Sequence, residues 1–527
     1  MKTLLKLAVM AALCFGTAFP QHDGHKAPDA NSTAKPIELV STDAITHRKV
    51  ATANKLAQSY FDQGLTLYYA FNDGDAVRSF RRAAELDPQL AMAYWGVALA
   101  AYPRSTGGGN SGDAERMKTA RDAIKMAVSM QAPPSDRIYV EALAKLFSDD
   151  SGSNRKSLEE AYRVAMKAVY KDSLQDPDAA ALYALSIFYA QGGDNWTRDG
   201  KPMGNWQEML DVLEAGMKLH PKHMGLTHTY IHGVEESLQP ERALAAADAL
   251  RGLKILIPSF GHLVHMPAHI YVRTGNFQKS IESNEETATM PTDTLSEEFR
   301  LWHYNHVLSF LLFSYGMQGN FAHVTDTLDR KLGFKTPRSA DQRPRYLVRF
   351  RHWDDILKAP ATPADGIPQT LTSWTWARTM AYIATGDIAK AEAERAKSAP
   401  DTSTLRKMDD ARIDAALARQ RGDKKAEIEF LRKAVAAEDS LDYSEPPLSI
   451  SPIRENLGGA LLRDGQNAEA EQVFREDLKR NVGSGRSLFG LMTALEAQGK
   501  KDEARTVQKQ YIKSWKYADI MLAVSDL

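Results

Sequence analysis

The chain has 527 residues, 43% of them hydrophobic, and its 66 lysines and arginines almost balance 67 aspartates and glutamates. A chain of this length can bury one large core or several cores in series. The balanced charge excludes the basic excess that is typical of nucleic-acid-binding proteins, and it also excludes a polybasic membrane anchor. We therefore expect no nucleic acid among its partners.

The first 18 residues have the pattern of a secretory signal peptide. Lys2 and Lys6 give a positive start, residues 7–15 form an apolar core, and Gly16-Thr17-Ala18 is a cleavage site of small residues. The apolar run is too short to span a bilayer as a helix. We expect cleavage near Ala18, a bacterial periplasmic or secreted protein, and no membrane-spanning segment after the signal is removed.

The only cysteine, Cys14, lies inside this predicted signal, so the mature chain would offer a metal no thiolate ligand. Residues 19–46 are polar and contain little apolar content, which predicts a disordered leader. His22 and His25 in this leader could capture a metal, but a flexible polar tail explains them without one.

Small and aromatic residues next mark a tetratricopeptide repeat, at the offsets of that motif: Gly64, Ala76, Phe80, Ala83 and Pro88. Small residues let two antiparallel helices approach closely, the phenylalanine fills the gap to the next repeat, and the proline ends the second helix. Further turns between helices are predicted at Gly275-Asn276-Phe277, Gly319-Asn320-Phe321, Gly386-Asp387 and Gly422-Asp423.

The repeat period becomes explicit near the end of the sequence, where Gly465 and Gly499, and Ala470 and Ala504, are each 34 residues apart. An insertion at residues 443–447 is expected to form a loop. The pattern predicts an all-α tetratricopeptide-repeat solenoid, curved into a closed or nearly closed superhelix. We expect N-terminal repeats over 47–260, central repeats with a histidine-rich groove over 261–400, and C-terminal repeats over 401–527.

Four stretches add a more specific resemblance: residues 91–96 (AMAYWG), 230–235 (YIHGVE), 262–270 (HLVHMPAHI) and 474–478 (FREDL). Together they resemble a widespread family of exported bacterial tetratricopeptide-repeat proteins, over about residues 50–515. The resemblance implies the helical-repeat fold and export, and it implies no particular activity.

Seven of the 14 histidines fall between residues 228 and 306. The first cluster is His228, His232 and Glu235, and the second is His262, His265 and His269. Each spacing places its side chains on one stripe of a helix. The sequence therefore predicts two neighbouring helices that present imidazoles on one face.

The repeat register can be set without the histidines. Pro221 and Pro258, as repeat-closing prolines, place the next first helices at Met224 and Gly261, and all six clustered residues then fall on positions that line the concave groove. Counting back from Gly319 starts the following first helix at Asn305, which adds His306, with His303 one turn before it. Neighbouring first helices lie about 8–10 Å apart, so their imidazoles could share one ion.

Histidine and carboxylate ligands without cysteine suit Zn, Cu, Mn or Fe. In such a site Glu235 would serve as a ligand or as a general base. Two alternatives stay open: a metal-free polar groove for an organic ligand, and histidines that only bond carbonyls or stack on aromatic rings. Pro267 either kinks its helix so that His265 and His269 meet, or ends the helix early.

Three functions follow from these patterns. The first is an exported binding protein or scaffold whose histidine-lined groove holds a transition metal, or a ligand coordinated through it. The second is a metal-dependent hydrolase or oxidoreductase that uses the same cluster. The third is a metal-free interaction scaffold, and in each case the groove would take a peptide, a protein or a small molecule.

Farther along, Arg343, Arg345, Arg349 and Arg351 form a basic run that suits a solvated face better than an anion site.

Overall fold

The computed structural model describes residues 37–40, 45–103, 113–147, 154–192, 195–255, 257–291, 297–332, 342–360, 368–398 and 401–527. The predicted signal peptide and most of the predicted leader lie outside these residues. Within them the regular structure is helical, apart from one isolated β-bridge between Trp196 and Pro202. The predicted all-α class is confirmed.

Helices pack in sequential antiparallel pairs, as a helical-repeat solenoid requires. The first half contains α1 (Lys55–Tyr69), α2 (Asp73–Leu86), α3 (Ala91–Ala101), α4 (Asp113–Ser129), α5 (Pro134–Ala144), η1 (Lys145–Phe147), α6 (Arg155–Asp172), α7 (Pro177–Gln191), α8 (Trp206–Leu219), α9 (Met224–Val234), η2 (Pro240–Ala243), α10 (Leu244–Gly252), η3 (Pro258–Phe260), α11 (Gly261–His265), α12 (Pro267–Arg273) and α13 (Phe277–Ala288). The second half contains α14 (Glu297–Met317), α15 (Phe321–Leu332), α16 (Gln342–Arg349), α17 (Trp353–Lys358), α18 (Pro368–Ala384), α19 (Ile388–Arg395), α20 (Thr404–Gln420), α21 (Lys424–Asp439), α22 (Ile453–Arg463), α23 (Asn467–Arg480), α24 (Gly485–Ala497), α25 (Lys501–Ser514) and η4 (Val524–Asp526).

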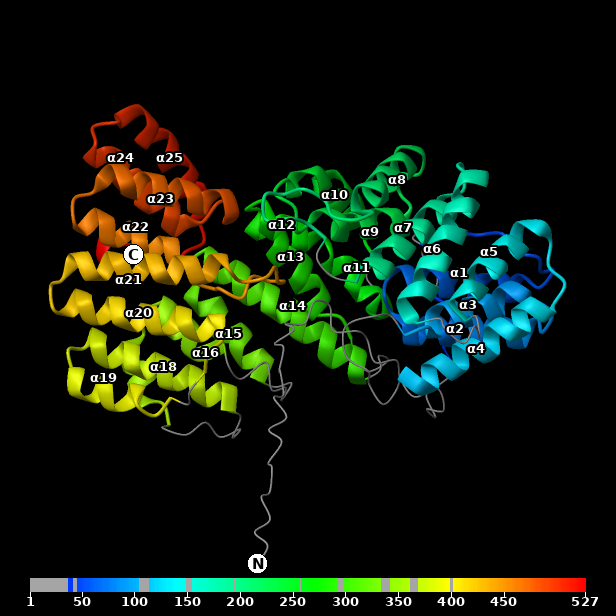
Figure 1. Ribbon diagram of the computed structural model, residues 1–527, viewed down its shortest axis with the longest axis horizontal. Helices are drawn as coiled ribbons and strands as arrows, with labels where there is room; N and C mark the ends of the chain where they lie inside the picture. Colours follow the sequence, from blue (N-terminus) through cyan, green and yellow to red (C-terminus); the bar gives the residue numbers. More distant parts are fainter. Residues whose placement is uncertain are drawn as a thin grey trace, which may run out of the picture.

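The N-terminal pairs occupy one end of the molecule and the C-terminal pairs the other, with α13 and α14 in the middle (Figure 1). The superhelix curls back on this middle part. A Cβ atom at Gly275, after α12, would lie 2.5 Å from the carbonyl oxygen of Val482, after α23. Gly319, after α14, packs in the same way against the ring of Trp515. The C-terminal repeats therefore contact the central helices directly.

Glycines that face a phenylalanine set the distance between helices within the repeats. Phe80 of α2 is fully buried, and Cβ atoms at Gly64 and Gly96 would lie 2.8 and 2.3 Å from its ring. Phe474 of α23 is buried in the same way between Gly458 and Gly490. The small and aromatic positions predicted from the sequence thus form the repeat contacts of a tetratricopeptide-like solenoid.

Replacing Gly96 with alanine is expected to lower the free energy of unfolding by about 1–3 kcal/mol, because the new methyl group overlaps a ring that has no free volume around it. Gly252→Ala is the matched control, since a Cβ there meets nothing within 4 Å and alanine favours the helix by about 1 kcal/mol. Urea denaturation measures both variants. Equal effects would contradict this account of the packing.

Among the described residues, eight turns between paired helices share one backbone position with a positive φ. Six of them use glycine, with φ between 71° and 84°: Gly275, Gly319, Gly386, Gly422, Gly465 and Gly499. The other two hold Phe71 at 58° and Arg351 at 60°. A side chain in this region costs about 1–3 kcal/mol and tends to mark a functional constraint. These two residues are therefore candidates for a role beyond the turn.

The predicted starts at Met224 and Gly261 are those of α9 and α11, but the predicted start at Asn305 is wrong, because α14 begins at Glu297. Pro267 interrupts the helix between α11 and α12, yet Met266 keeps right-handed helical angles, so the chain continues in one direction. Among the described residues, no helix has the length and apolarity that a bilayer crossing requires. The division at residues 260 and 400 stays a prediction.

Candidate metal centre

The predicted histidines converge in the interior of the molecule. His228 and His232 come from α9, a second set of three comes from α11 and α12, and His303 and His306 come from α14. Each is at most 4% exposed except His306, which is partly buried. The predicted concave groove is covered at this point, because Phe71 after α1 and Glu445 of the loop at residues 443–447 lie against these side chains.

Two groups of three imidazoles have the spacing of metal ligands. In the first, one nitrogen each of His228, His232 and His262 lies within 4.8 Å of the other two. In the second, the same holds for His265, His269 and His306. The two groups are adjacent, since the rings of His232 and His269 are 5.8 Å apart between centroids.

The closest contacts within each group join Nε2 atoms. These atoms are 3.0 Å apart between His228 and His232, and 2.9 Å apart between His265 and His269. The Nε2 atom of His306 lies 3.3 Å from that of His269. Tetrahedral Zn–N bonds of about 2.0 Å place ligand nitrogens about 3.3 Å apart, which is close to these three distances.

Hydrogen bonds to Nδ1 fix how the first pair is protonated. Nδ1 of His228 lies 2.5 Å from the backbone carbonyl oxygen of Tyr69, and Nδ1 of His232 lies 2.7 Å from Oε1 of Glu235. Carbonyl and carboxylate oxygens accept hydrogen bonds, so both protons sit on Nδ1. The Nε2 lone pairs then face each other and repel, unless a cation lies between them.

The second group is arranged in the same way. Nδ1 of His265 donates to Oδ1 of Asn284 at 2.6 Å, and the amide of Asn284 is oriented by its bond to the Ser280 carbonyl. Nδ1 of His269 lies 2.5 Å from Oε2 of Glu235 and 3.0 Å from Oε2 of Glu445. Oxygen partners on Nδ1 are the usual support of histidines that bind a metal through Nε2.

Glu235 joins the two groups, because one carboxylate oxygen accepts from His232 and the other from His269. With both oxygens occupied and 2% exposure, this carboxylate positions two imidazoles. The predicted role as general base stays a hypothesis. Glu235, His269 and Glu445 also lie within 4.8 Å of one another and could hold an ion themselves.

Burial and neighbouring charges set the protonation of the rings. Burial, with repulsion from nearby imidazoles, lowers the pKa of His262 and His265 well below 6.5, so both are neutral near pH 7. Burial alone would also lower the pKa of His269, but Glu235 and Glu445 raise it to about 10. A proton on His269 can therefore serve as the cation of the second group when no metal is bound.

His303 lies behind the two groups. Its ring is 5.8 Å from that of His262 and 5.9 Å from that of His265, between centroids, and it belongs to neither group of three. Burial lowers its pKa to about 3. The structure places it beside the candidate ligands as a neutral neighbour.

The metal-free protein is expected to lose stability as the pH falls from about 6.5 to 5. His262, His265 and His303, whose folded pKa values burial depresses, take up protons there only in the unfolded chain. Each such ring lowers the free energy of unfolding by about 1.4 kcal/mol per pH unit below 6.5. His269 does not offset this, since its raised pKa adds stability that is complete below pH 6.5 and is lost only as the pH rises toward 10.

Urea denaturation with a chelator present, at several values between about pH 5 and pH 7, measures this slope. His303→Gln removes one of the three titrating rings and should reduce the slope without removing a candidate ligand. A flat profile in the unmodified protein would contradict the buried, neutral state of these rings.

Two phenylalanines cover the groups, one each. Phe71 lies 5.4 Å from the His232 ring at an interplanar angle of 8°, and it also contacts His228 and His262. Phe310 of α14 lies 4.5 to 5.0 Å from the three rings of the second group. The strained φ of Phe71 therefore places an aromatic ring over the first group.

Phe71→Ala is expected to speed metal release from the first group by about tenfold or more, because water then reaches His228 and His232. Phe310→Ala is the matched variant and should act on the second group alone. Chelator-competition kinetics resolve the two release phases. If both variants changed the same release phase, the two phenylalanines would not each shield a separate group from water.

Four contributors to the centre were missed from the sequence: Tyr69, Phe71, Asn284 and Glu445. Phe71 could have been found from the sequence, because it stands directly before Asn72 at a turn position where most of the other repeats have glycine. The insertion at residues 443–447 was predicted as a loop, which it is, but nothing in its sequence showed that Glu445 reaches His269. Tyr69 acts through its carbonyl oxygen, which no side-chain pattern reveals.

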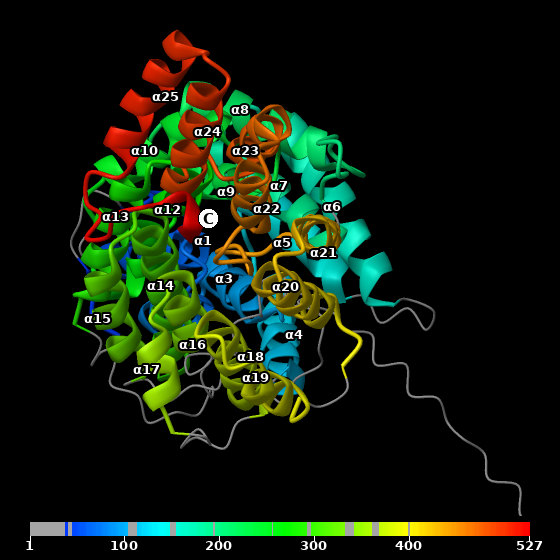
Figure 2. The ribbon, with the colours of Figure 1, turned by 90° about the vertical axis from the view of Figure 1, so that its left-hand side faces the viewer.

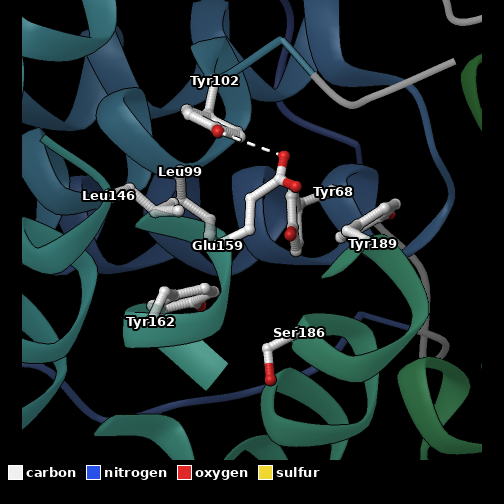
Figure 3. Close-up of a pocket in the computed structure, with 8 residues that line it drawn as sticks. All are labelled: Tyr68, Leu99, Tyr102, Leu146, Glu159, Tyr162, Ser186 and Tyr189. Carbon is white, nitrogen blue, oxygen red and sulfur yellow. Dashed lines mark hydrogen bonds between the residues drawn. The ribbon is translucent and has the colours of Figure 1, made fainter. Parts of the chain in front are cut away.

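A small cavity lies near the first group, because Tyr189 in its wall is 6.5 Å from Phe71 between ring centroids. Figure 3 shows its lining residues: Tyr68, Leu99, Tyr102, Leu146, Glu159, Tyr162, Ser186 and Tyr189. The Glu159 carboxylate pairs with Arg155 and accepts a hydrogen bond from Tyr102. Its charge is thus compensated within the protein.

Fold and centre define this chain as a tetratricopeptide-like helical-repeat protein with buried histidine–carboxylate clusters that could hold a metal. No family model matches the chain, and no curated protein matches it in sequence.

Among solved structures, human IFIT1 as a dimer with m7Gppp-AAAA matches at 14% identity and TM-score 0.31, over 88% of this chain and 91% of that one. Yeast Tom70 matches at 12% identity and TM-score 0.28, over 88% and 95%. The TPR domain of P58(IPK) matches at 13% and 0.26, over 85% and 99%. At these levels none of the ligands of these proteins is carried over to this chain.

Proposed function

We propose that this protein is a helical-repeat scaffold that holds transition-metal ions in two adjacent three-histidine sites linked by Glu235. One observation carries the proposal: Nε2 atoms meet at 2.9 to 3.3 Å while the Nδ1 atoms of four of these rings are bound to oxygen. Neutral rings held in this way aim their Nε2 lone pairs at a common point, and in the second group a metal ion would take the place of the extra proton that His269 carries without metal.

The ligand set narrows the choice of metal. Imidazole nitrogen suits Zn, Cu and Fe, and the nearby carboxylates of Glu235 and Glu445 widen the choice to Mn. Three protein ligands per ion leave one position for water or a small ligand, as in catalytic zinc sites. A metal-dependent enzyme acting on a small molecule is therefore the second candidate, with substrate entry past Phe71 or Phe310.

The proposal also includes a location in the periplasm and a partner in the groove. An exported protein without cysteine in its mature part would bind metal through histidine in an oxidising environment, which suits metal storage or delivery in the periplasm. A peptide, a protein or a small molecule in the concave groove is the proposed partner.

Titration of the chelator-treated protein with Zn, Cu, Mn or Fe tests the proposal. We expect two equivalents of at least one metal, bound at micromolar concentration or below. His323→Ala is the matched control, because His323 of α15 is exposed and its ring bonds Asn320, away from both groups. A protein that binds none of the four metals at about 100 μM would refute the proposal and leave a metal-free groove.

A further inference from the structure

Residues 524–527 lie against α22 in the C-terminal repeats. Figure 2 shows the red end of the chain beside α22, and η4 packs against that helix. Leu527 is 2% exposed, whereas Met521, six residues earlier, is 94% exposed. The segment is thus exposed at Met521 and buried at Leu527, and it lies against an arginine-lined site made by Arg351 after α16, Arg419 of α20, Arg463 of α22 and Arg486 of α24.

Four arginines hold this segment through its backbone. Arg351 and Arg419 donate to the carbonyl oxygen of Ser525 at 3.0 and 3.1 Å. Arg463 donates to the oxygens of Val524 and Leu527 at 3.1 and 3.0 Å, and Arg486 donates to that of Asp526. These contacts recognise the backbone oxygens of the 3-10 turn and so accept many sequences.

Two features add a preference for an acidic residue followed by an aliphatic one. Arg351 pairs with the Asp526 carboxylate. Gly459 in the middle of α22 makes room for the next residue, since a Cβ there would lie 2.5 Å from Cβ of Leu527. The Leu527 side chain joins the buried core of the C-terminal repeats. Glycine in the middle of a helix lowers stability, and the close approach of Leu527 explains why glycine stands at this position.

The arginines of this site are held in unfavourable states, which argues that the site is more than a packing contact. Arg351 takes a backbone conformation that the equivalent turns reserve for glycine. Burial, with Arg349 and Arg351 nearby, lowers the pKa of Arg486 to about 10, and burial with Arg463 nearby lowers that of Arg419. The basic run predicted as a solvated face instead sends Arg349 into the core, paired with Glu455, and Arg351 to this segment.

We propose that this arginine-lined site binds a short acidic–aliphatic peptide of a partner protein as a 3-10 turn, and that Val524–Leu527 occupies it within the same chain as a displaceable competitor. Residues 519–523 form the tether. Asp519 is fixed at the start of α15, where it accepts from the amides of Phe321 and Ala322 at 2.8 Å each. A competing peptide therefore needs to displace Val524–Leu527 but not Asp519. This proposal is independent of the metal centre.

Full-length protein carrying Asp526→Ala and Leu527→Ala provides the test, with a fluorescent peptide of residues 519–527 as the probe. The peptide should bind this variant at least about tenfold more tightly than the unmodified chain, since the internal competitor has lost its anchors. Adding Gly459→Ala to the variant should abolish binding, because the new Cβ takes the place of the leucine. Fluorescence anisotropy measures all three proteins.

A double variant that keeps its helicity yet does not bind the peptide at about 1 mM would overturn the proposal. A second measurement uses the unmodified chain alone. Saturating peptide should speed hydrogen exchange over residues 524–527 by displacing them, and unchanged exchange would overturn the proposal whether or not the variants fold.

Discussion

A chain in which His265 and His269 are both alanine is expected to bind one metal ion fewer than the unmodified protein. The two rings supply two of the three nitrogens of the second group, and a single remaining imidazole, His306, cannot hold an ion at micromolar concentration. Plasma mass spectrometry after removal of free metal measures the loss. Far-UV circular dichroism checks that helicity is retained.

The complementary variant, with alanine at His228 and His232, should lose the other ion. The two losses should add in the fourfold variant. A different result would show that these histidines serve the fold alone. In that case the variant without His265 and His269 would unfold, and the unmodified protein would contain no metal.

Glu235→Gln is expected to weaken binding of both ions by about 10- to 100-fold each, or about 1.4–2.7 kcal/mol per site. The carboxylate accepts from Nδ1 of His232 and from Nδ1 of His269. A glutamine has one acceptor oxygen, so its amide N–H must face one of these rings and disfavour the tautomer that binds metal through Nε2. Isothermal titration against a competing chelator measures both constants.

Glu445→Gln is the matched control, because among the candidate ligands Glu445 contacts His269 of the second group. This variant should weaken the binding of one ion and leave the binding of the other unchanged. If Glu235→Gln also affected a single ion, the carboxylate would not link the two groups.

Much of the centre could be predicted because helical periodicity acts over short distances. The spacings within 228–235 and 262–269 fix which side chains share a face, and prolines that close the repeats fix where α9 and α11 begin. The start of the third helix was misplaced because no proline marks it: counting back from Gly319 assumed a helix of ordinary repeat length, whereas α14 has 21 residues. His306 still faces the centre, since its orientation depends on helical phase.

Burial of the centre could not be predicted, because it depends on segments far away in the sequence. Tyr69 lies 159 residues before its partner His228, and Glu445 comes from the C-terminal repeats. Repeat periodicity places each helix beside its neighbours but does not specify how far the superhelix curls, so it could not show that residues 443–447 close over α12. Phe71 was the visible clue to this burial, as a departure from a glycine turn.

Elemental analysis of the protein, purified from its own cells without an affinity tag, tests the central claim most directly. The two-site account predicts close to two transition-metal ions per chain, one of which disappears when His265 and His269 are alanine. Protein that contains no metal, and that takes up none of Zn, Cu, Mn or Fe afterwards, would contradict it.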